Sequence, residues 1–340
     1  MNKLALLGVL GLALAGCSSP PTPDVERIAC AAGSVSGQGS SAQTNVVHAW
    51  IMDYQISCAD SAISYESVGS GAGVQAFAGG AGDFAGTDAF LSAGDQKKVD
   101  ARCDGPAVHL PLVVSPVALA YNVAGAEILN LSPAVAAKIF SGAITVWNDP
   151  TIVADNKGVA LPATRIRPIH RSDNSGTTAN FTKFLSTSPE WSFGSGSTWP
   201  VKGGAEERGS HRVAAAIART DGAIGYIEAS FARAADLPAA WLGDPSRGFS
   251  GPSDYATGRA LENASIDEDL RIAMNPSAEG YPLVAVTYEV VCATGTSAAA
   301  RSFLAYAAGT SGQQTAVSAG YVPLPEALRA RVAQVVAGLR

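Results

Sequence analysis

Two long apolar segments with β character constrain the fold of this chain more than any other feature. Residues 109–122 lie about a third of the way along the 340-residue sequence, and residues 281–291 lie near its end. This order suits a chain that leaves its first domain through one strand, builds a second domain and returns through the other. It indicates a first domain that is split in the sequence, with two consecutive domains as the alternative.

Strand-like and helix-like segments alternate along the rest of the chain, a pattern typical of α/β layering with a mainly parallel sheet. A hydrophobic content of 47% with 15% charged residues is ordinary for a chain that buries a substantial core. Ser132 and Pro133 open a predicted helix over 134–140, and Gly142 closes it. Further strands are predicted over 61–68, 165–170 and 222–228, and further helices over 177–185, 211–219, 298–308 and 325–339.

The N-terminus has the pattern of an export signal. A short positive end precedes an apolar run over 4–15, which is too short to span a bilayer permanently. The run ends in Leu-Ala-Gly-Cys at 14–17, which resembles a bacterial lipobox, whose cysteine is acylated and becomes the new N-terminus. We therefore expect a signal peptide over 1–16, a lipid-anchored Cys17, an extended tether over 17–27 and a body in an aqueous extracytoplasmic space.

Length and charge limit the classes of function. At roughly 150 residues per domain, the mature chain has room for about two domains. The full chain has a formal net charge of −6, and removal of Lys3 with the signal makes the mature protein more acidic by one unit. No basic face for nucleic acid is implied.

Four cysteines remain after Cys17, with no Cys-x-x-Cys pair among them. An even number in an oxidising compartment favours two disulfides, and three pairings exist. If Cys30 and Cys58 each begin a strand, they can meet at one sheet edge, which leaves Cys103 to pair with Cys292. The sequence does not choose among the three pairings.

Four short clusters rich in glycine and hydroxyl residues lie at 36–42, 69–73, 86–88 and 170–178. Each occurs where a strand is predicted to give way to a helix. A helix N-terminus presents unpaired N–H donors and the positive end of the helix dipole, so such clusters can form an anion site in an acidic protein. Helix capping and tight turns are the ordinary alternative for any single cluster.

Charged residues make the anion interpretation more specific. Arg171 offers a planar fork that matches a tetrahedral oxyanion, and Asp173 is placed to hold that fork. Asp88 is unexpected in an anion site, because a carboxylate repels the ligand. It fits a ligand that carries a proton for Asp88 to accept.

Other chemistries lack their motifs. No lysine is followed by Ser or Thr, as a nucleotide P-loop requires, and neither a Gly-x-Ser-x-Gly elbow nor a His-Glu-x-x-His helix occurs. We therefore expect no metal, no cofactor and no catalytic residue. A serine hydrolase that pairs Ser41, Ser70 or Ser175 with a distant histidine is the remaining enzymatic alternative. The four histidines lie far apart in the sequence, at His48, His109, His170 and His211.

These features together resemble the phosphate-binding lipoproteins that feed bacterial high-affinity phosphate ABC importers. The resemblance runs from about Ser36 to Glu228 and is weaker from Tyr281 onward. It rests on the shared order and spacing of short motifs. They are Gly-Ser-Ser at 39–41, Tyr-Glu-Ser-Val-Gly-Ser-Gly at 65–71, Asp-Phe-Ala-Gly-Thr-Asp at 83–88, Ile-Phe-Ser-Gly at 139–142 with Trp147, Arg-Ser-Asp-Asn-Ser-Gly-Thr at 171–177 and Gly-Ala-Ile-Gly-Tyr-Ile-Glu at 222–228.

The resemblance implies a two-domain periplasmic-binding-protein fold of the type II kind, with two α/β lobes joined by crossing hinge strands and one phosphate in the cleft. The first lobe would comprise 28–121 and 282–340, and the second 122–281. The implied phosphate ligands are Ser41, the Ala42 amide, Ser70, Asp88, Arg171, Ser175, Gly176 and Thr177, with Asp173 orienting Arg171. Two departures are Ala42, where relatives often have an aromatic residue, and the sequence Gly-Ala-Gly at 71–73 in place of Ser-Gly-Gly.

The implied function is phosphate capture by a monomeric receptor that catalyses nothing and passes its ligand to a membrane permease. The alternatives are a receptor for another oxyanion, such as sulfate or molybdate, and an extracytoplasmic phosphoester hydrolase.

Overall fold

The structure is a computed structural model that describes residues 28–275 and 278–340. The predicted signal peptide, the acylation site at Cys17 and the predicted tether lie outside the described residues. Among the described residues, no helix is both long and apolar enough to cross a membrane.

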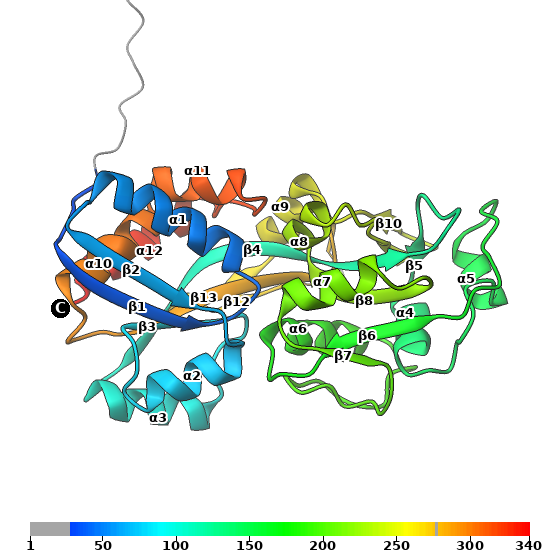
Figure 1. The fold of residues 1–340 in the computed structure, drawn as a ribbon, viewed down its shortest axis with the longest axis horizontal. Helices are drawn as coiled ribbons and strands as arrows, with labels where there is room; N and C mark the ends of the chain where they lie inside the picture. The colour runs from blue at the N-terminus through cyan, green and yellow to red at the C-terminus, as the bar shows by residue number, and fades with distance from the viewer. Residues whose placement is uncertain (1–27, 276–277) are drawn as a thin grey trace, which may run out of the picture.

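One eight-stranded mixed sheet runs along the molecule (Figure 1). Its strands are, in spatial order, β2 (Ser61–Glu66), β1 (Gly33–Gly39), β3 (Phe84–Thr87), β13 (Val284–Cys292), β4 (Ala107–Asn122), β8 (Ala223–Glu228), β6 (Arg167–Arg171) and β7 (Ala205–Glu207). The first three are parallel to one another, and so are the last three. Because β13 and β4 are antiparallel to each other and to their outer neighbours, the expectation of a mainly parallel sheet is correct only within each lobe.

The strands β4 and β13 carry the chain from one lobe to the other. Over 107–116 β4 pairs with β13, and over 117–122 it pairs with β8 of the second lobe. A chain that crosses once in each direction necessarily makes this pair antiparallel. The fold is two α/β lobes joined by crossing strands, and the exact boundaries of the lobes stay a prediction.

Helices cover both faces of the sheet in the first lobe (Figure 1). One face carries α1 (Thr44–Ser57), α10 (Ala298–Ala308), α11 (Thr310–Ser318) and α12 (Glu326–Gly338). The other face carries α2 (Ser70–Ala78) and α3 (Ala93–Cys103). Aromatic side chains fill this core, where Tyr54 of α1 meets the ring of Phe303 of α10 edge-on at 5.5 Å between centroids.

The second lobe repeats the arrangement. One face of its strands carries α7 (Ser210–Ala218) and α8 (Ala229–Ala234), and the other carries α4 (Pro133–Phe140) and α6 (Gly176–Leu185). The remaining elements are β5 (Asn130–Leu131), α5 (Pro150–Asp155), β9 (Trp241–Asp244), β10 (Gly248–Ser250), α9 (Asp254–Glu262), β11 (Ser265–Ile266) and β12 (Ile272–Ala273). Since helices cover both faces, β4 is buried along almost all of its 16 residues and therefore has a continuous apolar sequence.

Local sequence signals account for most element boundaries. The helix α10 has the predicted bounds, and α4 begins after Ser132, whose hydroxyl accepts the N–H of Val135. The strand β13 begins at Val284, three residues later than predicted. The sequence pattern does not predict α11, because Gly309 alone separates it from α10 and its residues lack apolar periodicity.

Two disulfides are present, Cys30–Cys58 and Cys103–Cys292, with Cα–Cα distances of 5.4 and 5.2 Å. Of the three pairings, this is the one expected if Cys30 and Cys58 each begin a strand, but both cysteines lie before their strands, which begin at Gly33 and Ser61. The first bridge joins the residues before β1 and β2, which are parallel neighbours. The second joins the C-terminal ends of α3 and β13, so it ties the return strand to the first lobe.

Candidate anion-binding site

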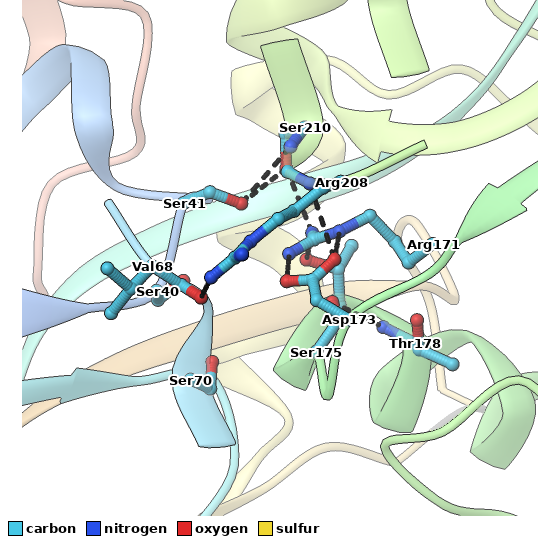
Figure 2. Close-up of polar contacts among 12 residues, drawn as sticks. Ser40, Ser41, Val68, Ser70, Arg171, Asp173, Ser175, Thr178, Arg208 and Ser210 are labelled. Carbon is cyan, nitrogen blue, oxygen red and sulfur yellow. Dashed lines mark hydrogen bonds and ion pairs between the residues drawn. The ribbon is translucent and has the colours of Figure 1, made fainter. Parts of the chain in front are cut away.

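The four clusters meet between the two lobes. The neighbouring parallel strands β1, β2 and β3 end at one edge of the sheet, and the segments after them bring Ser41, Ser70 and Asp88 together. The second lobe supplies Arg171 from the end of β6 and Ser175 from the N-terminus of α6 (Figure 2). Each of these five side chains is at most 5% exposed. Polar groups from both lobes are therefore buried against one another.

Asp88 accepts hydrogen bonds from three hydroxyls. Its Oδ1 accepts from Ser40 Oγ at 2.6 Å and from Thr287 Oγ1 at 2.7 Å, and its Oδ2 accepts from Ser70 Oγ at 3.2 Å. Burial raises the pKa of Asp88, and the hydrogen bonds from Ser40 and Thr287 oppose that rise. The expectation that Asp88 lies where a helix begins is wrong, because β3 ends one residue before it and α3 begins five residues after it.

Arg171 is held in a bidentate pair with Asp173. Its Nε donates to Oδ1 at 2.7 Å and its Nη2 donates to Oδ2 at 2.5 Å, and the Asp173 carboxylate also accepts from the N–H of Gly209. The remaining nitrogen, Nη1, donates to Thr177 Oγ1 at 3.4 Å and to Ser210 Oγ at 3.3 Å. Burial lowers the pKa of Arg171, but the Asp173 carboxylate outweighs burial and keeps that pKa above its usual value. Asp173 therefore holds the guanidinium so that its Nη1 points toward Thr177 and Ser210.

The N-terminus of α6 faces the first lobe. Ser175 is the N-cap, and its hydroxyl accepts the N–H of Thr178 at 3.2 Å. The N–H of Gly176 donates to Ser70 Oγ at 3.2 Å across the lobe boundary. A Cβ on Gly176 would lie 2.6 Å from the Cβ of Asp88, so only glycine permits this approach. The positive end of the helix dipole thus points at the segment that contains Asp88.

The Ser41 hydroxyl and the Ala42 amide have hydrogen-bond partners in different lobes. Ser41 Oγ accepts the N–H of Ser210 at 3.1 Å and lies 3.4 Å from Ser210 Oγ. The N–H of Ala42 donates to Ser40 Oγ at 3.0 Å. The Ser41 hydroxyl therefore reaches the second lobe, whereas the Ala42 amide turns toward the hydroxyl that binds Asp88.

Further contacts bring the lobes together around the site. Arg208 Nη2 donates to the carbonyl of Val68 at 3.3 Å (Figure 2). The N–H of Gly71 donates to the carbonyl of Asn174 at 3.1 Å, and a Cβ on this glycine would lie 2.4 Å from the Asn174 side chain. The departure at 71–73 thus places glycine, in place of serine, at the position that touches the second lobe.

Four buried polar residues of the site are not among the ligands predicted from the sequence. Ser40 adjoins Ser41 in the same loop. Ser210 follows a glycine at the start of α7, and the same Gly-Ser pattern at the start of α2 marks Ser70. Glu228 is a carboxylate at the end of a buried strand, whose Oε1 accepts from Thr177 Oγ1 at 2.8 Å. Thr287 lies inside the apolar strand β13, and only its polarity there marks it.

The histidines and serines do not form the alternative hydrolase. In the described part of the chain, no histidine is hydrogen-bonded to Ser41, Ser70 or Ser175, whose hydroxyls contact Ser210, Asp88 and Thr178. Residues 28–275 and 278–340 also contain no group of three or more His, Cys, Asp or Glu side chains that could hold a metal ion.

Comparison with known proteins identifies the relatives of this chain. Residues 24–311 match the family model described as "PBP superfamily domain". The chain is 37% identical to phosphate-binding protein PstS 3 of Mycobacterium leprae, with 96% of each chain covered. It is 38% identical to PstS 2 of Mycobacterium tuberculosis, covering 88% of this chain and 85% of that protein. These relatives are named as binding proteins, not as enzymes.

Solved structures share the fold. A high-affinity periplasmic phosphate-binding protein, PfluDING with bound phosphate, superposes with a TM-score of 0.71 at 23% identity and covers 88% of this chain and 93% of its own. A phosphate ABC transporter substrate-binding protein from Clostridium perfringens, also with bound phosphate, has a TM-score of 0.65 at 16% identity and covers 86% and 100%. With the sequence relatives and the two-lobe architecture, these findings show that the chain belongs to the PstS-type family of phosphate-binding proteins in the PBP superfamily.

Proposed function

We propose that the protein binds one inorganic phosphate between its two lobes and delivers it to a membrane ABC importer. Support comes from the PstS-type relatives and from the polar groups of both lobes that converge on Asp88 and Arg171. Asp88 follows β3 in one lobe, and Arg171 ends β6 in the other. A ligand held by both residues therefore requires the lobes to come together.

The proposed ligand set combines hydroxyls, amides and one guanidinium. Asp173 orients Arg171 and also neutralises its charge, so most of the attraction for the anion comes from hydrogen-bond donors and the α6 dipole. The proposed ligands are Ser41, Ala42, Ser70, Asp88, Arg171, Ser175, Gly176 and Thr177. The proposed lobes are 28–121 with 282–340, and 122–281.

The observation that favours phosphate over another oxyanion is the buried carboxylate of Asp88. Phosphate at neutral pH retains at least one proton, which a carboxylate can accept in a hydrogen bond, whereas sulfate has none. A buried acceptor left facing a fully ionised anion is strongly unfavourable. The site therefore suits a protonated oxyanion and disfavours sulfate or molybdate.

The transport role includes a location and a partner. We propose that Cys17 is lipidated, that the lipid anchors a monomeric protein to the cell membrane on the extracytoplasmic side, and that the closed form docks on the membrane permease of a phosphate importer. The apolar run before Cys17 and the PstS-type relatives support this arrangement.

One titration tests the proposed ligand. Purified protein stripped of phosphate by partial unfolding and dialysis is titrated calorimetrically with phosphate and with sulfate. We expect tight 1:1 binding of phosphate and at least a thousandfold weaker binding of sulfate. A site that leaves a buried polar group unpaired with the wrong ligand can reach a larger ratio of affinities than this. Equal affinities for the two anions, or no binding of phosphate, would contradict the proposal.

A further inference from the structure

Glu228 is a second buried carboxylate at the site, and the phosphate-binding scheme above gives it no role. It ends β8, its side chain is fully buried, and its Oε1 accepts the hydroxyl of Thr177 at 2.8 Å. Its Oε2 is buried and has no hydrogen-bond partner among the described residues. An unpartnered carboxylate oxygen in such a place is costly when the group is charged.

The surroundings of Glu228 do not neutralise it. Arg171, the cation whose charge acts on Glu228, is already paired with Asp173. The backbone neighbour on β4 is Val117, which is apolar. Burial raises the pKa of Glu228, and the charge of Asp88 raises it further, which together outweigh the opposing effects of Ser210, Arg171 and Thr177. The polar and titratable groups that face Glu228 are Arg171 of β6, Thr177 of α6, Ser210 of α7, Asp88 after β3 and Tyr321 between α11 and α12.

The Thr177 hydroxyl has one proton, and the group that receives it decides whether Thr177 can donate a hydrogen bond to an anion. In the structure this proton goes to Glu228 Oε1, while the Thr177 oxygen accepts from Arg171 Nη1 at 3.4 Å. A hydroxyl that donates to a charged glutamate has no proton left for phosphate. If Glu228 instead carries a proton, it donates to Thr177, and the Thr177 proton is free to turn toward a phosphate oxygen.

A bound phosphate adds negative charge close to Asp88 and Glu228, which favours protonation of the more poorly solvated carboxylate. We propose that Glu228 is a positioning residue that takes up one proton from solvent when phosphate binds and thereby releases the Thr177 hydroxyl to donate to the ligand. This inference rests on the proposed phosphate site. It predicts that phosphate binding is linked to proton uptake at Glu228 in addition to any uptake by phosphate itself.

Calorimetry in buffers of different ionisation enthalpy measures this uptake. Phosphate is titrated into the wild type, Glu228→Gln and Glu66→Gln between pH 6 and pH 9. Because the titration of phosphate itself is common to all three proteins, it cancels in the comparison. Gln at 228 mimics the protonated carboxyl, so the wild type should take up as much as one proton more than Glu228→Gln and lose affinity up to tenfold more steeply per pH unit. Glu66 is exposed on β2, and its variant should match the wild type.

The outcomes separate the two proposals. Phosphate binding with the same proton uptake and parallel pH profiles in wild type and Glu228→Gln overturns the role of Glu228 and leaves the proposed function intact. Absence of phosphate binding by the wild type overturns the proposed function instead.

A second measurement does not depend on the folding of Glu228→Gln. Infrared difference spectra of wild-type protein with ¹³C-labelled glutamate should gain a protonated-carboxyl band when phosphate is added. The band should persist in Glu289→Gln, which removes a buried glutamate of the first lobe, on β13. A wild type without this band, or a band lost in Glu289→Gln, overturns the assignment to Glu228.

Discussion

Gly176 lies against Asp88 so closely that a Cβ on the glycine would lie 2.6 Å from the Cβ of the aspartate. The two residues come from different lobes, so the lobes approach here to backbone distance. We expect Gly176→Ala to hold the lobes apart and to weaken phosphate binding at least about fivefold, since overpacking a tight contact costs about 1–3 kcal/mol. Calorimetry gives the affinity, and small-angle scattering at saturating phosphate gives the compaction.

The matched control for this substitution is Gly258→Ala in α9, where a Cβ would meet nothing within 4 Å. This variant should bind and compact like the wild type. If Gly176→Ala does so as well, the contact with Asp88 is not needed for closure.

Arg171→Ala should weaken phosphate binding by about 2–5 kcal/mol, the range for removing one partner of a buried charge pair. The loss includes the cost of leaving Asp173 buried without its partner. Arg171→Lys should restore only part of the affinity, because an ammonium cannot engage Asp173 in a bidentate pair and also reach the ligand. Arg219→Ala, which removes an exposed ion pair with Glu207, is the control and should leave the affinity unchanged. Unchanged affinity in a folded Arg171→Ala protein would remove this residue from the site.

Asp88→Asn should change selectivity more than affinity. The substitution removes the charge that repels sulfate and supplies an amide donor, so sulfate affinity should rise at least tenfold, about 1.4 kcal/mol. Phosphate affinity should change less, because the amide oxygen still accepts the phosphate proton. Competition titrations of both anions measure the ratio, with the exposed Asp60→Asn as control. An unchanged phosphate-to-sulfate ratio would place Asp88 outside the ligand shell.

Cys17→Ala should release the protein from the membrane without altering phosphate binding. A lipid chain adds membrane affinity and nothing at a site formed by residues far along the sequence. Detergent-phase partitioning of cell extracts measures the first effect and calorimetry the second. A variant that still partitions as a lipoprotein would contradict acylation at this cysteine.

The two disulfides should differ in their contribution to stability. Cys103–Cys292 closes a loop with a sequence separation of 189, and Cys30–Cys58 one of 28. In the chain-entropy model the longer loop stabilises by about 2 kcal/mol more. Urea unfolding of the two double-serine variants measures the difference, and a larger loss from the shorter loop would contradict this ranking.

The sequence is informative where one local signal decides the outcome. The crossing strands follow from their long apolar runs, and Arg171 with Asp173 from a spacing of two residues that the bidentate pair uses directly. Contacts between distant segments are not visible in this way. Thr287 reaches Asp88 across 199 residues, and its place in an apolar strand gives no hint of the partner.

The neighbouring hydroxyls of Ser40 and Ser41 show a second limit. Both belong to the same loop, but only the Ser40 hydroxyl binds Asp88, while that of Ser41 faces Ser210. Both serines are buried, and they follow Gly39, whose φ of 143° is a backbone conformation that composition does not specify. A motif therefore predicts that hydroxyls are present at the site but not which atom makes each contact.

The hydrogen bond from Thr287 ties the carboxylate of Asp88 to a crossing strand. A rotation displaces atoms in proportion to their distance from its axis. A closure that turns about the crossing strands β4 and β13 would therefore move Asp88 little and would move Arg171, which ends a strand two places beyond β4, much further. If the lobes close in this way around the proposed phosphate, the anion contacts the Asp88 carboxylate before the guanidinium reaches it.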